Sequence, residues 1–211
     1  MGSVADITAF SFFPTKNITT AEGGAVAARD AATLLRAREF ARQGIIRDSS
    51  RHVVQDQGPW HQEVHEFGLN YRLPDVLAAL GSQQLRRLGA FKARRSVIKA
   101  TYDSVLTDVD GVDVPAQREY VDPTWHLYPL RVPSGRRRTI FERLRSAGIG
   151  VQVNYLPAYW HPVFADLGYP RGLCPNAERF YSREISLPMY AALDDEEIRF
   201  VGDTVASLVR D

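Results

Sequence analysis

The sequence predicts an α/β fold, and three observations support this prediction. Short apolar segments rich in β-branched and aromatic residues, typical of buried strands, alternate with segments of helical periodicity. One helical pattern runs without a clear stop from Leu73 to Leu106. Near residue 110 the long helical pattern has ended, and short strand and helix patterns follow. We therefore expect part of an α/β sheet and a long connecting helix in residues 1–110, and a compact small α/β domain in residues 111–211.

The first region begins with two expected strands. Residues 6–13 (DITAFSFF) have the composition of a buried strand, and residues 23–28 (GGAVAA) form a second apolar segment after a glycine pair. Residues 30–44 have a helical period, with Asp30 as the N-cap and a glycine at the end. The polar stretch 45–66 holds three of the five histidines, and we expect an irregular loop there.

The long helical pattern contains one proline and two glycines that bear on where the helix begins and whether it bends. Pro74 suits the first turn of a helix, where its missing N–H is not needed. Gly81 and Gly89 break the helical propensity inside the pattern. Either close packing against a neighbour or a bend in the helix accounts for such a glycine.

The second region alternates again between strand and helix patterns. Acidic residues cluster in the first turn of its last helix, where the helix dipole favours them. The expected strands are residues 125–132, 150–156 and 185–190, and the expected helices are residues 138–149, 176–185 and 193–210.

Composition excludes several classes of protein. The 211 residues are 45% hydrophobic and 24% charged, which is ordinary for a globular protein. The net charge is +1, so no overall excess of positive charge attracts nucleic acid or an anionic membrane. No apolar run reaches the roughly 18 residues of a membrane span, and no signal-peptide pattern is visible. Cys174 is the only cysteine. These features predict a cytoplasmic protein. The run Arg136–Arg138 fits either a solvated helix start or a phosphate contact.

Lys16 is the first candidate for chemistry. A lysine that bonds to an aldehyde must be fixed in place, desolvated and able to lose its proton near neutral pH. In SFFPTKNITTAEGG, a strand end and a proline turn precede this lysine, and the Ser11 hydroxyl could donate to a cofactor phosphate. Thr19, Thr20 and the glycine pair would let backbone approach closely. Read alone, the same pattern also fits an exposed loop lysine followed by a turn.

Three motifs, in order, resemble one family. GSVADITAFSFFPTKNITTAEGGAVAARD resembles the lysine segment of the DegT/DnrJ/EryC1/StrS family of nucleotide-sugar aminotransferases. FGLNYRLPDVLAALGSQQLRRL resembles its second signature, written around G-x-N-x-R, and GIGVQVNYLP with CPNAERFYSREISLPMYAALDDEEI resembles its C-terminal signatures. The resemblance extends over essentially the whole chain.

This resemblance implies a type I pyridoxal 5'-phosphate (PLP) fold and a homodimer. By motif match, Lys16 would bond to the cofactor and move protons between the amino donor's α-carbon and the cofactor's C4′. Ser11 would bind the cofactor phosphate. Asn70 would reach the phosphate of the neighbouring subunit's cofactor, and Arg72 would support that site. Outside the motif, Asn70 also fits a turn residue before Pro74.

Within the family, the chain is most similar to the UDP-4-amino-4,6-dideoxy-N-acetyl-altrosamine transaminase type. The resemblance implies transfer of an amino group, with glutamate as the usual donor, to a nucleotide-linked 4-keto-6-deoxy sugar for cell-surface polysaccharide or glycan biosynthesis. Sugar-dehydrating relatives have histidine in place of the lysine, so Lys16 argues for amino transfer.

The chain departs from the family pattern at two places near substrate. It has ARQG (residues 41–44) where many relatives have R-x-H-G, and Asn154-Tyr155 where many have His-Tyr. His126 could face the sugar or be a hydrogen-bonded core histidine. We expect no metal site, because His61, His65 and His161 show no recognised ligand spacing.

The resemblance starts partway through the family pattern. The acidic residue for the pyridine nitrogen, the stacking aromatic residue and a glycine-containing phosphate loop have no match, and Asp6 corresponds to a strand start. We therefore expect a truncated fold, with the last strands of the large-domain sheet and the complete small domain. Two hypotheses follow: an aminotransferase whose other half is elsewhere, or a non-catalytic remnant or assembly partner of such an enzyme.

Overall fold

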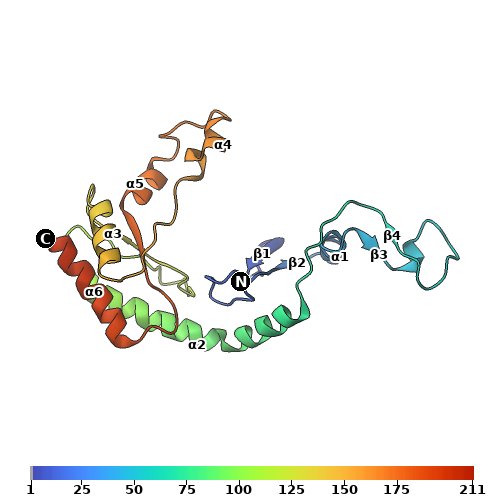
Figure 1. Ribbon diagram of the computed structural model, residues 1–211, viewed down its shortest axis with the longest axis horizontal. Coiled ribbons are helices and arrows are strands. Elements are labelled where there is room, and N and C mark those ends of the chain that lie inside the picture. Colours follow the sequence, from blue (N-terminus) through green and yellow to red (C-terminus); the bar gives the residue numbers. More distant parts are fainter. Residues whose placement is uncertain (1) are drawn as a thin grey trace. The chain divides into compact units, whose positions relative to one another are not determined.

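A computed structural model describes residues 2–211 (Figure 1). The chain forms two compact units, one up to Leu88 and one from Gly89 to Asp211, and the division falls inside helix α2 (Asp75–Leu106). A Cβ atom on Gly89 would meet nothing within 4 Å, so this helical glycine is not a packing requirement. The domain boundary that the sequence places near residue 110 stays a prediction.

Unit 1 begins with a two-stranded antiparallel sheet. Strands β1 (Ile7–Ser11) and β2 (Gly24–Ala28) lie where the sequence predicts strands, and Ser11 pairs with Gly24. The expectation that β1 is buried is wrong, because its residues are exposed or half-buried. Two strands of five residues cannot cover both of their own faces, so their apolar side chains remain accessible in this chain.

Helix α1 (Ala31–Phe40) begins as predicted. The Asp30 carboxylate accepts a hydrogen bond from the backbone N–H of Thr33 at 2.8 Å, which caps the helix. The helix ends at Phe40 rather than at Gly44. Gly44 has a φ of 74°, and a Cβ atom there would lie 1.8 Å from the carbonyl oxygen of Glu66. This glycine therefore lets the backbone after the helix lie close to the Glu66 carbonyl.

The stretch expected to be an irregular loop contains some regular structure. Strand β3 (Ile45–Ile46) pairs antiparallel with strand β4 (Glu63–Val64), and the 3₁₀ helix η1 (Ser49–Arg51) lies between them. Two-residue strands carry too little periodicity to be recognised in a sequence. The pairing brings the ends of the stretch together and leaves residues 52–62 as a loop.

Helix α2 begins at Asp75, directly after Pro74, as the first-turn proline predicts. Gly81 marks close packing, because a Cβ atom there would lie 2.8 Å from Cγ2 of Thr20. Thr20 is 1% exposed, so this contact seals the loop that follows Lys16 against the start of α2.

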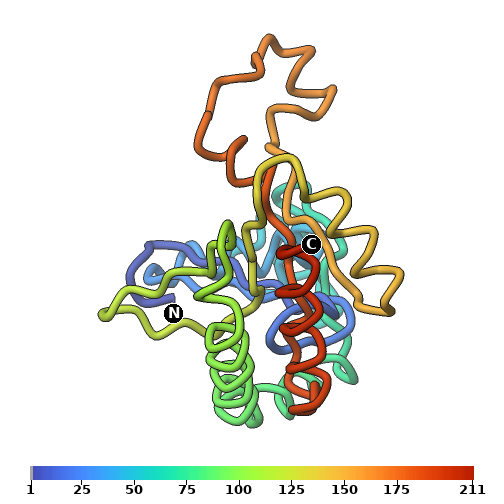
Figure 2. The backbone as a smooth tube through the Cα atoms, turned by 90° about the vertical axis from the view of Figure 1, so that its left-hand side faces the viewer, coloured from blue at the N-terminus to red at the C-terminus, as the bar shows by residue number. Residues whose placement is uncertain are grey.

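Unit 2 holds the hydrophobic core. Strands β5 (Tyr128–Arg131) and β6 (Glu184–Leu187) pair antiparallel, and helices α3 (Arg137–Ser146), α5 (Pro175–Arg183) and α6 (Asp195–Arg210) accompany them. Figure 2 shows α6 beside the C-terminal part of α2, where Val105 approaches Gly202. The rings of Tyr102 and Tyr128 meet at 4.9 Å inside this core. None of the described helices has the length and apolar character that crossing a membrane requires.

Unit 2 also departs from expectation. The strand expected at residues 150–156 is wrong, since only Gln152 forms a β-bridge there, with Ser186. The short helices η2 (Ala158–Trp160) and α4 (Pro162–Ala165) were not expected. The acidic first turn of α6 is confirmed as a capping box, in which Asp194 and Glu197 each bond the other's backbone N–H.

The arginine run has a structural role. Arg136 donates to the carbonyl oxygens of Leu208 and Val209, the last turn of α6, at 3.0 and 2.6 Å. Arg137 donates to the carbonyl of Tyr181, and Arg138 pairs with Glu142 on its own helix. The run therefore stabilises the helices of unit 2.

Candidate functional site

Lys16 lies on the loop that joins β1 to β2. Ser11 ends β1, Pro14 and Thr15 form the turn, and the backbone N–H of Lys16 closes it by donating to the carbonyl of Phe13 at 2.9 Å. The lysine is half-buried and Ser11 is exposed. A single turn thus brings the predicted aldehyde-binding amine and the predicted phosphate-binding hydroxyl onto one short segment.

The rest of this loop is braced by its own hydrogen bonds. The carbonyl oxygen of Phe12 accepts from the backbone N–H of Thr20 and from the Thr19 hydroxyl, both at 3.0 Å. The N–H of Phe12 donates to the carbonyl of Gly23 at 2.9 Å. Because the loop is tied on both sides of the lysine, the backbone of Lys16 has a defined position.

The glycine pair serves packing within the loop. Gly23 has a φ of 149°, and a Cβ atom on it would lie 2.5 Å from Oγ1 of Thr20 and 2.8 Å from Leu73. A Cβ atom on Gly24 would lie 2.6 Å from the carbonyl oxygen of Phe10 on the paired strand. The close backbone approach predicted for these glycines occurs, and the protein itself fills the space.

Asn70 and Arg72 form the second part of the candidate site. Nε of Arg72 donates to Oδ1 of Asn70 at 2.9 Å, and both side chains are exposed. The segment is docked beside the end of α1, because the N–H of Tyr71 donates to the carbonyl of Ala41 at 2.9 Å and Asn70 forms a β-bridge with Arg42. The arrangement leaves the two terminal nitrogens of Arg72 available for an anionic oxygen.

The four predicted site residues form two separate pairs. Among the described contacts, none joins Ser11 or Lys16 to Asn70 or Arg72. The role of Asn70 at the cofactor of a neighbouring subunit stays a prediction.

The donor set fits PLP at two of its groups. The Lys16 amine suits the aldehyde and the Ser11 hydroxyl suits the phosphate, and the braced loop holds both. Asp6 does not suit the ring nitrogen, because it precedes β1 and lies roughly 16 Å along the strand from Ser11 at a rise of about 3.3 Å per residue. The chain's own loop therefore offers one group suited to the aldehyde and one suited to the phosphate, and their roles stay predictions.

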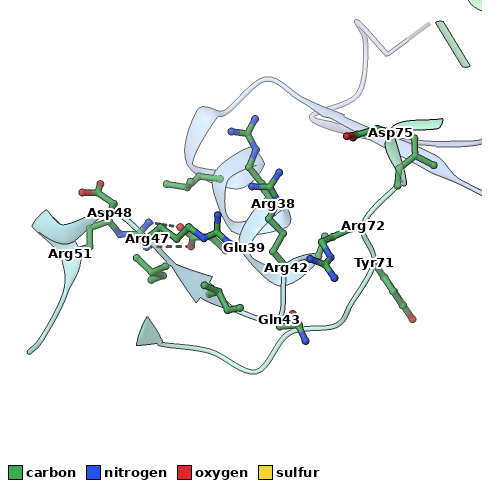
Figure 3. A pocket seen from close by; sticks show the side chains of 15 residues that line it. Arg38, Glu39, Arg42, Gln43, Arg47, Asp48, Arg51, Tyr71, Arg72 and Asp75 are labelled. Carbon is green, nitrogen blue, oxygen red and sulfur yellow. Dashed lines mark hydrogen bonds and ion pairs between the residues drawn. The ribbon is translucent and has the colours of Figure 1, made fainter. Parts of the chain in front are cut away.

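A hollow lies beside the end of α1, as Figure 3 shows. Its volume is about 720 Å³, and it includes Arg72. We call it the arginine pocket, because five of its lining residues are arginines. They come from α1 and the turn after it, from the segment after β3, and from the segment before α2. These residues are Arg38, Arg42, Arg47, Arg51 and Arg72. The sequence pointed to Arg72 through its motif and to Arg42 only as part of the ARQG segment. The other three could not be recognised, because the arginines are spaced too widely to form a run.

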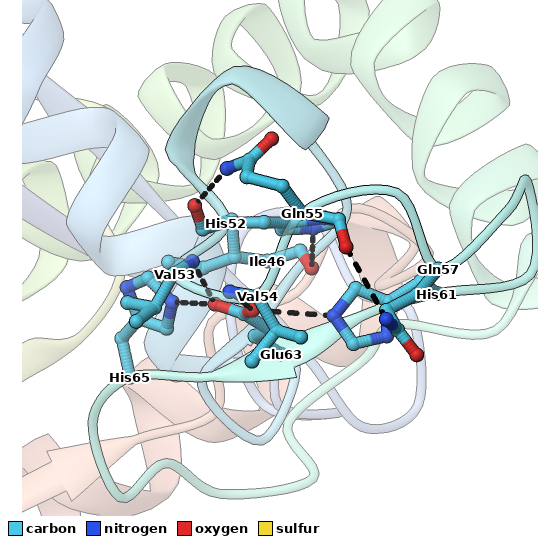
Figure 4. A network of polar contacts seen from close by, with 9 residues as sticks. All are labelled: Ile46, His52, Val53, Val54, Gln55, Gln57, His61, Glu63 and His65. Atoms are coloured by element: carbon cyan, nitrogen blue, oxygen red, sulfur yellow. Dashed lines mark hydrogen bonds and ion pairs between the residues drawn. The ribbon is translucent and has the colours of Figure 1, made fainter.

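A second polar cluster lies on the loop between β3 and β4 (Figure 4). Nε2 of His65 and Nε2 of His61 contact the two carboxylate oxygens of Glu63 at 2.6 and 3.2 Å. The hydrogen bond with His65, and then the backbone N–H groups of Val53 and Val54, hold the pKa of Glu63 well below its ordinary value. No group of side chains suited to a metal ion occurs among residues 2–211. The cluster therefore fixes a loop.

In unit 2, Asn154 forms a hydrogen bond with the buried carboxyl group of Glu184. The Asn154 N–H donates to Glu184 at 2.7 Å, and its side-chain amide donates to Oγ of Ser186 at 2.9 Å. Glu184 is fully buried, and this burial raises the pKa of its carboxyl group. His126 is half-buried, and its backbone carbonyl accepts from Arg95 at 3.3 Å. Two hydrogen bonds thus hold Asn154 against strand β6.

Comparison with family models gives one family. The model of the DegT/DnrJ/EryC1/StrS aminotransferase family matches residues 1–206. The UDP-4-amino-4,6-dideoxy-N-acetyl-beta-L-altrosamine transaminase of Campylobacter jejuni is 34% identical over 213 residues, which are 99% of this chain and 54% of that protein. The chain spans about half the length of the curated relatives it matches.

Solved structures agree with the expected fold. PseC from Helicobacter pylori, an aminotransferase involved in the biosynthesis of pseudoaminic acid, matches with a TM-score of 0.88 and 30% identity, over 98% of this chain and 54% of PseC. The PLP form of Spr1654 from Streptococcus pneumoniae matches with a TM-score of 0.88 and 29% identity, over 99% of this chain and 53% of Spr1654. The expectation of a truncated type I PLP fold is confirmed by these matches.

Proposed function

Because the chain belongs to the DegT/DnrJ/EryC1/StrS aminotransferase family, we propose that it carries the cofactor-binding lysine of an enzyme that transfers an amino group to a nucleotide-linked sugar. The observation that carries this proposal is the braced turn around Lys16. The turn fixes the backbone of a half-buried lysine that follows Ser11 on the same short loop.

PLP supplies an electron sink when it is bound. When PLP is bound, the Lys16 amine would bond to its aldehyde and would carry a proton during transfer of the amino group. The Ser11 hydroxyl would donate to the cofactor phosphate. The hydrogen bonds at Phe12 fix the backbone from which the Lys16 side chain extends.

A second copy of the chain completes the site in this proposal. Asn70 would reach the phosphate of the cofactor held by the partner, and Arg72, whose Nε donates to Oδ1 of Asn70 at 2.9 Å, would support that site by holding the Asn70 side chain. The active form is therefore a homodimer. The substrate is a nucleotide-linked 4-keto-6-deoxy sugar on a route to cell-surface polysaccharide or glycan, and glutamate is the donor.

A second candidate function is that of a non-catalytic remnant or assembly partner. One observation favours it: apolar residues of the first sheet are open, with Ile7 56% and Val26 49% exposed. Open apolar strands bind a partner or aggregate. This candidate needs no reaction at Lys16.

The test is whether the purified chain forms a covalent link with PLP at Lys16. The absorbance spectrum is recorded after adding PLP, the link is fixed with borohydride, and the labelled residue is identified by mass spectrometry. We expect a visible band that Lys16→Ala abolishes and that Lys92→Ala keeps, since Lys92 is paired with Asp122 in unit 2.

Glutamate then tests the first half of the reaction, because transfer of its amino group would bleach the band. Labelling spread evenly over the lysines, or a band that survives Lys16→Ala, would contradict the proposal. That result would leave the assembly role as the function of these 211 residues.

A further inference from the structure

We propose that a pocket beside α5 in unit 2 binds the phosphate group of a small phosphate monoester. The pocket has a volume of about 360 Å³ and is lined by residues from the end of β5 and from α5: Arg131, Asn176, Arg179, Phe180 and Arg183. We call it the α5 pocket. It lies within unit 2 and shares no residue with the arginine pocket or the Lys16 loop, so the proposal does not depend on the proposed function.

The α5 pocket carries an excess of positive charge. Three of its lining residues are arginines, and none of them carries a carboxylate. Among the described residues, Asp113 is the carboxylate that pairs with these arginines, at 3.0 Å from Nη2 of Arg183 and 3.6 Å from Nε of Arg131. Three arginines and one shared aspartate leave a net charge of +2 at the pocket.

The acidic neighbours of these arginines in the sequence are engaged elsewhere. Glu178 precedes Arg179, but its carboxylate accepts from the Tyr159 hydroxyl at 2.7 Å. Glu184 begins β6, is fully buried and accepts from the Asn154 N–H at 2.7 Å. Neither glutamate lines the pocket, so an anion from solution would relieve the repulsion among the arginines.

Two of the arginines are held in place before any ligand binds. Nε of Arg183 donates to the carbonyl of Val132 at 2.7 Å, and its Nη2 donates to the carbonyl of Gly111 at 3.1 Å. Nη2 of Arg179 donates to Oδ1 of Asn176 at 2.5 Å. No described contact uses Nη1 of either arginine, so each keeps a donor for an anionic oxygen. Donors that are already positioned lose little freedom on binding.

Charge and volume favour a phosphate monoester over other anions. A monoester carries a charge of about −1.5 to −2 near pH 7 and three acceptor oxygens, which match the net charge and the guanidinium donors better than a single carboxylate does. A volume of about 360 Å³ lies in the range of small-molecule sites and is more than inorganic phosphate fills. Half-buried Phe180 adds an apolar wall for the organic part of the ester.

The experiment is an NMR titration of the full 211-residue chain, isotope-labelled, with glycerol 3-phosphate, inorganic phosphate, acetate and glycerol as separate ligands. Signals are followed residue by residue, which distinguishes binding at the α5 pocket from binding at the arginines of unit 1. We expect glycerol 3-phosphate to shift the amide signals of Arg179, Phe180 and Arg183 until they saturate. Inorganic phosphate and acetate should bind more weakly, and glycerol should leave these signals unchanged.

Arg179→Gln tests the arginine with the fewest structural contacts. It should weaken binding of glycerol 3-phosphate about 10-fold, the usual effect of losing one charged hydrogen-bonding group. The fold should be kept, because Arg179 is exposed and its described hydrogen bond is to Asn176 on the same helix. The matched control is Arg199→Gln, an exposed arginine on α6 that does not line the pocket, and circular dichroism checks both variants.

Asp113→Asn tests the charge itself. Removing the one carboxylate that Arg131 and Arg183 share should tighten binding about threefold, the effect expected of one exposed charge. A variant with unchanged or weaker binding would overturn the argument from excess charge. This outcome separates an electrostatic site from a merely structural cluster, which would gain nothing from the loss of its aspartate.

The remaining outcomes are equally decisive. Signal shifts confined to unit 1, or wild-type affinity in Arg179→Gln, would overturn the inference. Equal affinity for glycerol 3-phosphate and inorganic phosphate would overturn the assignment to an ester. Lys16→Ala should bind glycerol 3-phosphate at the α5 pocket like the wild type, because Lys16 does not line it.

Discussion

Oγ1 of Thr20 lies 2.5 Å from the position that a Cβ atom would take on Gly23. The same Cβ atom would lie 2.8 Å from the Leu73 side chain, just before α2. Thr20 also approaches Gly81 on α2, so a threonine and two glycines lock the loop after Lys16 onto this helix. The position of the lysine thus depends on a contact several residues away from it.

Gly23→Ala should destabilise unit 1 by about 2 kcal/mol. The added methyl group has no room beside Thr20, and a φ of 149° is strained for alanine. Hydrogen exchange of the Thr20 amide, which bonds the carbonyl of Phe12, measures the effect locally and should speed up. The control is Gly89→Ala, which meets nothing within 4 Å and should stabilise the helix by about 1 kcal/mol. Equal effects of the two changes would show that the contact with Thr20 is unimportant.

Arg95→Ala should lower the free energy of unfolding of unit 2 by about 3 kcal/mol, because it leaves buried carbonyl groups without donors. Nη1 of Arg95 donates to the carbonyls of Trp125 at 3.0 Å and Met189 at 2.5 Å, and the residue is 5% exposed. Burial lowers the pKa of this guanidinium, so the hydrogen bonds must offset a cost of desolvation.

Urea unfolding followed by circular dichroism measures the change at Arg95. Arg199→Ala is the matched control, since Arg199 is an exposed arginine on α6 and its loss should change stability by less than about 0.5 kcal/mol. If Arg95→Ala were as harmless as the control, the carbonyl contacts of Arg95 would contribute no net stability.

Glu63→Gln should loosen the loop between β3 and β4 at neutral pH and have little effect in acid. The folded-state pKa of Glu63 lies below its ordinary value of 4.5, so its contribution is fully present above pH 4.5. It is lost as the pH falls from there through the folded-state pKa, because the unfolded chain then binds the proton more readily. Wild type and variant should therefore converge in acid.

Amide-exchange protection of Val53 and Val54 reports this loss, because their N–H groups donate to Glu63 at 2.8 and 2.7 Å. Glu66→Gln is the control, since Glu66 is exposed and contacts Arg36 at only 3.5 Å. A difference between wild type and Glu63→Gln that persists unchanged at low pH would contradict the assigned role of the carboxylate.

Several elements could be predicted because their causes are local. Asp30 caps α1, Pro74 precedes α2, and Asp194 with Glu197 caps α6, each within four residues of the helix that it starts. The failures have non-local causes. Residues 150–156 alternate like a strand, but only Gln152 finds a backbone partner, which a sequence pattern does not specify.

The candidate site divides in the same way. Lys16 and Ser11 are five residues apart on one loop, so the sequence and its family motifs suffice to bring them together. The arginine pocket joins residues from Leu35 to Asp75, and the pairing of Arg42 with Asn70 is a contact across 28 positions. No local pattern could show that these charges share one hollow.

The sequence by itself determined the family, the helix caps and the lysine loop, because motif identity and short-range hydrogen bonding are written in consecutive residues. Only the tertiary structure decided which polar groups are paired. It placed Arg136 on the last carbonyls of α6 and left Arg38, Arg42 and Arg47 around an open pocket. The physical reason is that burial and charge pairing depend on which distant segments meet, and this is decided by the packing of the folded chain.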